Sequence, residues 1–451
     1  MKFEAIKSIL LTFLIALSLL LTFAIWNYEG EYEESANDRS TDAQLEGSEA
    51  TKQSLIKPSQ IVFHWDQEHL GFHQKTDELE IFQALSDWFL YDFTMLEEGI
   101  GVDTEKERIE IVFPTPLPSQ YIPDLFTTNE TIRIDNQFKR IILYLDENRT
   151  TNQIIFDNSD PNGIDITAQV QNISQVIQYV TDLQAEKEFD TLVPVELSEQ
   201  TVYLPTEQTI KGRKFRYTEI QADTNSFKSI FFPNPFSVRS SRNAEGGTVY
   251  SDGTREMIVK GYHVEFTNFS VTDDQAQNNQ NELNTVQDPA DLLITRSIDH
   301  INAHKGWLVD ESIQYHLYDV NAAYQFVEYR MMYENFPVFS NNGLSSMSVV
   351  IQNNTIYQYN RPLMKLTYPY DRAETDLMSA KDLIQYLKDS NDFSLEEVYD
   401  IQLGYRIEQQ AGTQFFDLIP SWCIETSTGM QFISNNVQKN QGGNSNAMGS
   451  N

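Results

Sequence analysis

The chain has 451 residues, with 40% hydrophobic and 12% aromatic residues, and this composition excludes a protein that is disordered throughout. Its formal net charge of −34 at pH 7 makes nucleic acid an unfavourable partner, because both surfaces would repel each other. Its one cysteine, Cys423, leaves no intramolecular disulfide and is expected to be a buried core residue rather than a nucleophile.

An uncharged apolar run of 18 residues extends from Ile9 to Trp26 and would be about 27 Å long as a helix, close to the hydrocarbon thickness of a bilayer. Lys2 and Lys7 precede this run and acidic residues follow it, so the N-terminus is expected in the cytoplasm and the bulk of the chain outside. The run is longer than the apolar core of a signal peptide and lacks a small-residue cleavage site. Residues 1–28 are therefore predicted to be a cytoplasmic N-terminus and an uncleaved, single-pass anchor in the cell membrane.

Four hydroxyl residues lie on one side of this predicted helix, within an arc of about 120°: Ser8, Thr12, Ser18 and Thr22. Small hydroxyl side chains let a second membrane helix approach closely and offer it hydrogen bonds. Alternatively, each hydroxyl bonds to a carbonyl of its own helix and faces lipid. Both interpretations stay open, and these four residues are the candidate contact with a partner inside the membrane.

The next segments in chain order are a stalk and a first domain. Residues 29–56 are polar and acidic and are expected to be flexible. Residues 57–205 contain segments in which apolar residues recur at helical spacing and others in which they alternate as in strands, which predicts an α+β domain. Strands are expected at 59–65, 107–113 and 139–146, helices from Thr76 and Val170, and a loop at the prolines between 114 and 123.

The remaining residues suggest a duplication. Residues 206–372 form a predicted β-rich domain that includes a strand at 228–232, a polar linker at 273–284 and a first helix-plus-sheet module opened by Asp288-Pro289. Residues 373–437 form a second module opened by Ser379. Both helices contain Ala-x-x-Leu-Ile, apolar strands follow each, and the two modules close with single strands expected at 348–359 and 430–434. The tail at 438–451 is expected to be disordered. The predicted fold class is α+β, a membrane helix followed by antiparallel sheets flanked by helices.

Histidines are the main candidates for metal binding or catalysis. His64, His69 and His73 lie close together in the sequence, but no His-Glu-x-x-His motif is present, and a strand-to-loop placement would point His64 away from the others unless the loop folds back. His300 and His304 are four apart on a predicted helix, without an obvious third ligand, and could instead favour the dipole at its C-terminus. We assign no catalytic residue, metal or cofactor. An enzyme would require the first three histidines to meet around one cavity.

One basic cluster stands out in this acidic chain: Lys211, Arg213, Lys214 and Arg216. On a strand, alternate members of the cluster share one face. That face either contacts an acidic partner or is a solvated sheet surface, and the sequence leaves both possibilities open.

Several segments together resemble the YycH (WalH) family. They are the KSILLTFLIALSLLLTFAIWNY anchor, the LIKPSQIVFHW segment after the stalk, and the later NFPVF, YQYNRPL and LIPSW segments. The final module is separately similar, at the level of fold, to small PepSY-like domains.

The resemblance implies a non-enzymatic, single-pass protein of low-GC Gram-positive bacteria. Members of the family act with a YycI (WalI) sister protein on the WalK sensor histidine kinase of the WalRK two-component system, which controls cell-wall metabolism. Their membrane helix contacts the spans of the kinase, and the family has no established catalytic residues. The alternatives are an extracytoplasmic module that binds a wall polymer or small ligand in an apolar or aromatic cleft between the two repeated modules and, less favoured, a cell-wall enzyme.

Overall fold

The computed structural model describes residue 18 and residues 45–434, apart from gaps at 46, 97–102, 104–105, 133, 135, 146–152, 159–162, 172, 199, 208, 220–223, 272–288, 311, 391–394 and 414. Most of the predicted span, most of the stalk, the linker at 273–284 and the tail at 438–451 lie outside the described residues. No helix within the described part is long and apolar enough to cross a membrane. The described residues from Leu45 onward belong to one compact unit.

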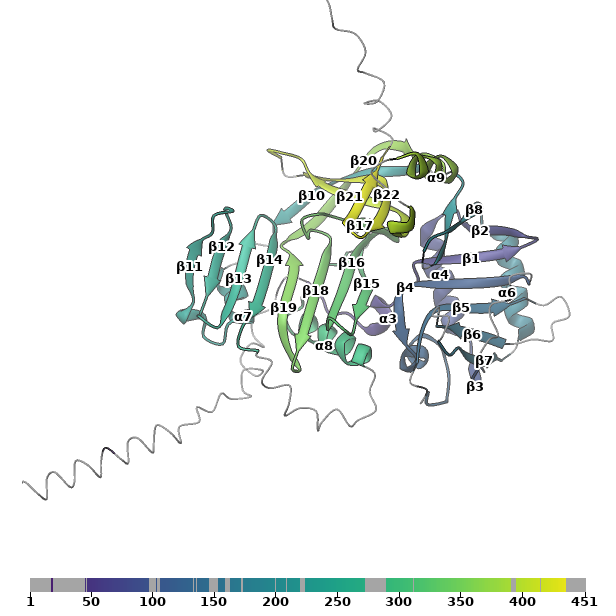
Figure 1. Ribbon diagram of the computed structural model, residues 1–451, viewed down its shortest axis with the longest axis horizontal. Coiled ribbons are helices and arrows are strands. Elements are labelled where there is room, and N and C mark those ends of the chain that lie inside the picture. Colours follow the sequence, from purple (N-terminus) through teal and green to yellow (C-terminus); the bar gives the residue numbers. More distant parts are fainter. Residues whose placement is uncertain are drawn as a thin grey trace, which may run out of the picture. The chain divides into compact units, whose positions relative to one another are not determined.

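The first part of this unit is a sheet of nine described strands, all antiparallel, in the order β3-β7-β6-β5-β4-β1-β2-β8-β9 (Figure 1). The strands are β1 (Gln60–Trp65), β2 (Glu68–Phe72), β3 (Leu90–Met95), β4 (Arg108–Pro118), β5 (Gln137–Tyr144), β6 (Gln153–Asp157), β7 (Ile166–Val170), β8 (Phe189–Glu196) and β9 (Thr201–Pro205). The accompanying helices are α3 (Lys52–Leu55), α4 (Lys75–Ser86), a 3₁₀ turn η1 (Ser119–Tyr121), α5 (Ile122–Leu125) and α6 (Ile173–Glu186).

Alternation along β4 separates two faces of this sheet. Phe113 lies on one face, where its ring is 5.9 Å from that of Phe82 in α4. Glu110 lies on the other face, where it is buried among charged side chains. The expected loop at 114–118 was wrong, because β4 continues to Pro118. Pro114 and Pro116 are accommodated because pairing with β5 is interrupted between Val112 and Leu117, and Pro118 is the last residue of the strand.

The second part is a sheet of 14 described strands. Its path runs β11-β12-β13-β14-β19-β18-β16-β17-β21-β22-β10-β20, with β15 paired to β16 and β23 paired to β22. The strands are β10 (Thr209–Glu219), β11 (Arg239–Arg242), β12 (Thr248–Ser251), β13 (Arg255–Lys260), β14 (His263–Asn268), β15 (Ile313–Asn321), β16 (Phe326–Tyr333), β17 (Phe336–Phe339), β18 (Ser346–Gln352), β19 (Thr355–Pro362), β20 (Met364–Asp376), β21 (Val398–Gln409), β22 (Phe415–Thr426) and β23 (Gly429–Ile433). The helical elements are α7 (Thr224–Phe231), η2 (Pro235–Ser237), α8 (Pro289–Ala303), α9 (Ala380–Asp389) and η5 (Leu395–Glu397).

Each predicted repeat has its helix followed by antiparallel strands. Helix α8 contacts β15, β16 and β18, while α9 is capped by the Ser379 side chain, which accepts a hydrogen bond from the Asp382 N–H. The strands of both repeats nevertheless belong to one sheet, because β17 pairs with β21 in parallel through Val338 and Tyr405. The two predicted modules therefore share backbone hydrogen bonds.

Two further local expectations were wrong. Residues 228–232 were predicted as a strand, but most of them lie in helix α7, where Phe227 and Phe231, four residues apart, are both buried. The apolar segment at 348–359 was predicted as one strand, but it is a hairpin of β18 and β19. Asn353 and Asn354 form its turn with φ angles of 47° and 65°, a conformation that asparagine tolerates better than most residues.

Candidate functional site

Residues 45–58, which we call the connecting segment, join the predicted span and stalk to the folded body. Ser48 pairs with Trp307 by two backbone hydrogen bonds of 2.9 and 3.3 Å. A Cβ atom at Gly47 would lie 2.5 Å from the carbonyl oxygen of Trp307 and closer still to that of Lys305. Only glycine permits this approach, so the backbone of the segment lies directly against the turn after α8.

Asn302, in the last turn of α8, holds the next residues of the segment. Its side-chain oxygen accepts hydrogen bonds from the Ala50 N–H at 2.9 Å and from the Trp307 indole N–H at 2.7 Å. Its side-chain nitrogen donates to the Ala50 carbonyl at 2.9 Å. All three bonds are partly or wholly shielded from water, so loss of Asn302 would leave several polar groups without partners.

Lys52 of α3 joins this segment to both sheets. Its ammonium lies 3.0 Å from the Asp291 carboxylate in α8 and 4.3 Å from the centre of the Tyr121 ring. The Tyr121 hydroxyl in turn donates to the Asp291 carbonyl at 3.4 Å. One cation therefore links a turn beside the first sheet to the helix of the second.

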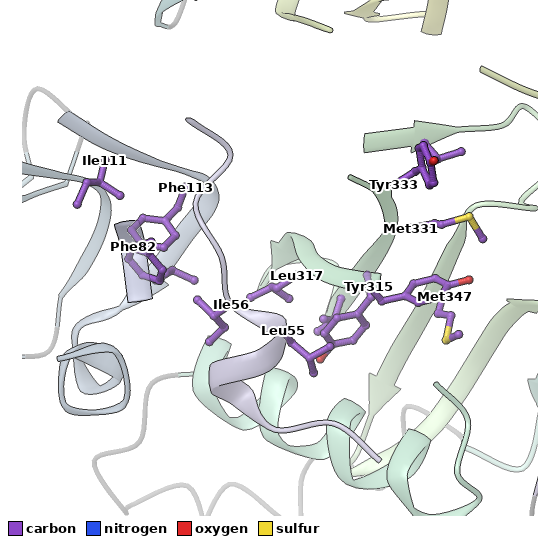
Figure 2. Close-up of a cluster of buried hydrophobic side chains, with 14 of the residues drawn as sticks. Leu55, Ile56, Phe82, Ile111, Phe113, Tyr315, Leu317, Met331, Tyr333 and Met347 are labelled. Atoms are coloured by element: carbon purple, nitrogen blue, oxygen red, sulfur yellow. The ribbon is translucent and has the colours of Figure 1, made fainter. Parts of the chain in front are cut away.

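Leu55 and Ile56 fix the end of the segment. Their exposed fractions are 2% and 1%, and Figure 2 shows them between Phe82 and Phe113 on one side and Tyr315 on the other. The expectation of a flexible stalk up to residue 56 was therefore wrong at its C-terminal end. The two aliphatic residues close the hydrophobic core between the sheets, and burial of such residues outweighs the entropy of a free linker.

A cleft of about 1400 Å³ lies between the first sheet and strands β15, β16, β21 and β22 of the second. Gln60, Glu110 and Arg140 line it from the first sheet, and Glu328 and Asp400 line it from the second. A cavity of this volume is large enough for a ligand. Its lining combines charged residues with apolar and aromatic ones such as Phe72, Leu192 and Tyr203. Strands of both repeated modules form one of its walls, so it is not the cleft between the modules considered above.

Carboxylates gather on the second-sheet wall of this cleft: Asp319, Glu328, Asp400 and Glu425. Burial raises the pKa of Asp400 to about 6, against the opposing charge of Lys139. Burial likewise raises the pKa of Glu328, although the ion pair with the Arg330 guanidinium acts to lower it. The wall therefore holds carboxylates that protonate more readily than solvent-exposed ones.

Gln200 connects the two walls. It accepts a hydrogen bond from Lys139 of β5 at 2.9 Å, and it donates to the Tyr399 carbonyl at 3.0 Å and to the Asp400 carboxylate at 3.4 Å. The cleft is thus bridged at this end by a chain of polar contacts between the two sheets.

His64 and His69 meet because the chain folds back after β1, and the hairpin of β1 and β2 brings them opposite each other. Their Nδ1 atoms are 2.8 Å apart, and Nε2 of His64 is 3.1 Å from the Glu110 carboxylate. Burial raises the pKa of Glu110, but the hydrogen bond from His64 and the charge of Arg140 outweigh it and leave the pKa lowered. This cluster is a buried ion-pair network.

His73 does not join this pair. Its Nδ1 is 3.0 Å from the Asp190 carboxylate, which raises the pKa of His73 through that hydrogen bond. Within the described residues, no group of three histidine, cysteine or carboxylate side chains could hold a metal ion. The three histidines therefore do not converge as the enzyme hypothesis requires.

His304 is buried and His300 half-buried against the Tyr359 ring, with centroid distances of 5.6 and 5.0 Å. Burial lowers the pKa of His300 to about 4, and the charge of Arg361 acts in the same direction. The lowered pKa disfavours the protonated imidazole with which the helix dipole would interact most strongly. Cys423 is buried as expected, and burial raises the pKa of its thiol.

Of the four hydroxyl residues predicted to contact a partner in the membrane, the structure describes Ser18 alone, which is helical and exposed. Ser8, Thr12 and Thr22 lie outside the described residues, so the contact stays a prediction. The attachment of the connecting segment to the folded body was not expected from the sequence. The feature that could have indicated it is the aliphatic pair Leu55-Ile56 at the end of a polar stretch.

The comparisons with known proteins match almost the whole chain. The family model described as "YycH protein, N-terminal domain" matches residues 4–185, and that described as "YycH protein, C-terminal domain" matches residues 199–440. The chain belongs to the YycH family. A relative from Bacillus subtilis (strain 168), named "Two-component system WalR/WalK regulatory protein YycH", is 23% identical over 472 residues, which cover 99% of each chain.

The YycH fold is also found by structural comparison. The crystal structure of YycH from Bacillus subtilis superposes with a TM-score of 0.67 at 18% sequence identity, covering 87% of this chain and 100% of that one. This family member therefore shares the arrangement of mixed helices and antiparallel sheets, although most aligned positions carry different residues.

Proposed function

We propose that this YycH-family chain regulates a sensor histidine kinase of the WalK type and thereby cell-wall metabolism, in a complex with a YycI-like sister protein. The observation that carries the proposal is the match along 99% of both chains to a relative named as a WalR/WalK regulatory protein. The buried ion-pair network around Glu110 has the arrangement of a structural cluster, and this agrees with a regulator rather than an enzyme.

In this proposal the anchor at 1–28 lies in the cell membrane with the N-terminus in the cytoplasm, and Ser8, Thr12, Ser18 and Thr22 contact the spans of the kinase. Regulation requires that the chain bind one arrangement of the kinase more tightly than another. The connecting segment supports such a role, because it attaches the residues after the stalk to both sheets through Asn302 and Lys52.

The test measures transfer of phosphate from the kinase to its response regulator in membranes with and without the full-length chain. The native chain should change the rate severalfold. Replacing the four hydroxyl residues by leucine should remove most of that change, because the close helix contact is lost. The control replaces leucines outside the hydroxyl arc, Leu10, Leu17, Leu20 and Leu21, by isoleucine. An unchanged rate with the native chain would contradict the regulatory role, and equal effects of both variants would contradict the hydroxyl contact.

A second candidate function, binding of a ligand from the cell wall, is favoured by the cleft of about 1400 Å³. Its carboxylate-rich wall fits a ligand with amino groups better than an anionic polymer. Titration calorimetry of the full-length chain with a lysine-containing wall peptide, against the same peptide acetylated on lysine, tests this. Heat of binding that is absent for the acetylated peptide supports the function, and no heat for either contradicts it.

A further inference from the structure

Tyr368 is held in an unfavourable conformation at the edge of the second sheet. Its φ angle is 52°, in the left-handed region that disfavours a bulky side chain, and 71% of its surface is exposed. The ladder between β10 and β20 explains its position, because Phe215 pairs with Pro369 while Arg216 pairs with Thr367. Tyr368 is therefore the extra residue of a β-bulge, a device that re-aims a side chain.

Tyr370 and Phe415 extend this aromatic surface. The Tyr370 ring lies 5.8 Å from that of Phe415, and 49% of Tyr370 is exposed. In the unbound chain, neither the strained backbone of Tyr368 nor its exposed ring contributes to the stability of the fold. A backbone outlier combined with exposed tyrosines is an arrangement found at recognition sites.

Two cations lie on the same surface. The Lys214 ammonium is 4.3 Å from the centre of the Phe415 ring, and Lys214 is opposite Tyr370 in the ladder. Arg216 is exposed and opposite Phe415, and it forms no ion pair with another described residue. The two cations attract carboxylates locally, whereas two copies of this chain, each with a net charge of −34, would repel each other. We therefore expect an acidic segment of another protein rather than a second copy.

The backbone of β20 is available as well. Within the described residues, β20 is the last strand of the sheet path and pairs with β10 alone, over 13 residues. Edge strands are usually protected by being short or charged. At the opposite end of the path, β11 has four residues with Arg239 and Arg242 at its ends, which is such a protected edge. The longer β20 carries charged residues in its C-terminal half, from Asp371 to Asp376, but the stretch from Thr367 to Tyr370 presents aromatic residues beside the cations.

We propose that the surface formed by Lys214, Arg216, Tyr368, Tyr370 and Phe415, the tyrosine edge, binds an extended, carboxylate-bearing segment of a partner protein. The segment adds a strand to β20, its carboxylates meet the two cations, and its apolar side chains pack on the tyrosines. The site does not depend on the identity of the kinase, so it stands or falls separately from the regulatory role.

The experiment uses the full-length chain in detergent and a fluorescent peptide of alternating glutamate and valine, read by anisotropy. A second peptide with prolines at alternate positions cannot add a strand and serves as the ligand control. Lys214→Glu with Arg216→Glu should weaken binding at least tenfold. Arg239→Glu with Arg242→Glu makes the same change in net charge elsewhere and should weaken it less than twofold.

Tyr368→Gly separates docking from folding. Glycine adopts the observed φ without strain, so this variant should melt at a higher temperature than the native chain while binding the peptide several times more weakly. Equal binding of both peptides, equal effects of the two charge reversals, or unchanged binding by Tyr368→Gly would overturn the inference. Binding to phosphatidylglycerol vesicles through Lys214 and Arg216, without binding to the peptide, would also overturn it in favour of a lipid surface.

Discussion

Asn302 and Ala50 are joined by two hydrogen bonds of 2.9 Å, one in each direction between a side-chain amide and the backbone. This contact connects residues separated by 252 positions in the sequence and attaches the connecting segment to the end of α8. Movement of the preceding residues would thus be transmitted to the folded body rather than lost in a free linker.

Asn302→Ala should destabilise the chain by about 2–4 kcal/mol, because the Ala50 backbone and the Trp307 indole lose buried partners. Denaturant unfolding measures the loss, and proteolysis should cut residues 45–58 faster in the variant. Asn342→Ala, on an exposed loop, is the control and should change stability by less than about 0.5 kcal/mol. Equal protease resistance of the variant and the native chain would contradict the role of Asn302.

Ile56→Ala tests the hydrophobic part of the same attachment. Because Ile56 is 1% exposed, its truncation should cost about 2–4 kcal/mol of unfolding free energy. The neighbouring exposed residue gives the control variant, Gln53→Ala, which should be nearly neutral. A loss below about 1 kcal/mol for Ile56→Ala would mean that residues 55–56 do not close the core between the sheets.

The Glu110 network predicts a pH-dependent stability. The pKa of Glu110 is lowered in the folded state, so its stabilising effect is present above its ordinary value of 4.5 and is lost as the pH falls through the folded pKa. Glu110→Gln should therefore destabilise the chain at pH 7 by about 1–3 kcal/mol and by less near pH 4. Thermal melts across this range measure it. A constant difference between the two chains would contradict the assignment. The control is Glu207→Gln, at an exposed residue that forms no ion pair with another described residue, and it should change stability little at every pH.

The raised pKa of Asp400 predicts the opposite dependence of stability on pH. Its folded pKa of about 6 is above its ordinary 3.8, so the folded chain binds the extra proton and stability falls as the pH rises between these values. Asp400→Asn removes the unfavourable charge and should stabilise the chain at pH 7.5 by about 1–3 kcal/mol, with little effect at pH 4. Melting curves that stay parallel from pH 4 to 8 would argue against a buried, ionised Asp400.

Local patterns predicted many elements correctly. The helix opened by Pro289 and the cap at Ser379 follow from residue types whose effect is confined to one turn. The strand at 107–113 follows from alternation, but its extension to Pro118 does not, because whether a proline fits depends on the partner strand. The turn at Asn353-Asn354 was missed because an apolar run of this length fits one strand or two.

The candidate sites depended on contacts that local patterns do not contain. The meeting of His64 with His69 requires a two-residue turn at Asp66 and Gln67, both with positive φ angles. The burial of Leu55 depends on side chains more than 200 residues away, such as Tyr315. The basic cluster could be recognised in the sequence, but the strained Tyr368 beside it could not, because a bulge arises from the register of two strands.

The most direct test of a regulatory complex formed through the membrane helix is co-purification from membranes of the kinase and the sister protein with the full-length chain. It compares the native chain with a variant whose residues 1–28 are exchanged for an unrelated span of equal length. We expect the kinase to co-purify with the native chain and to fall at least tenfold with the exchanged span. Retention of the kinase at the native level after the exchange would contradict contact through the membrane helix.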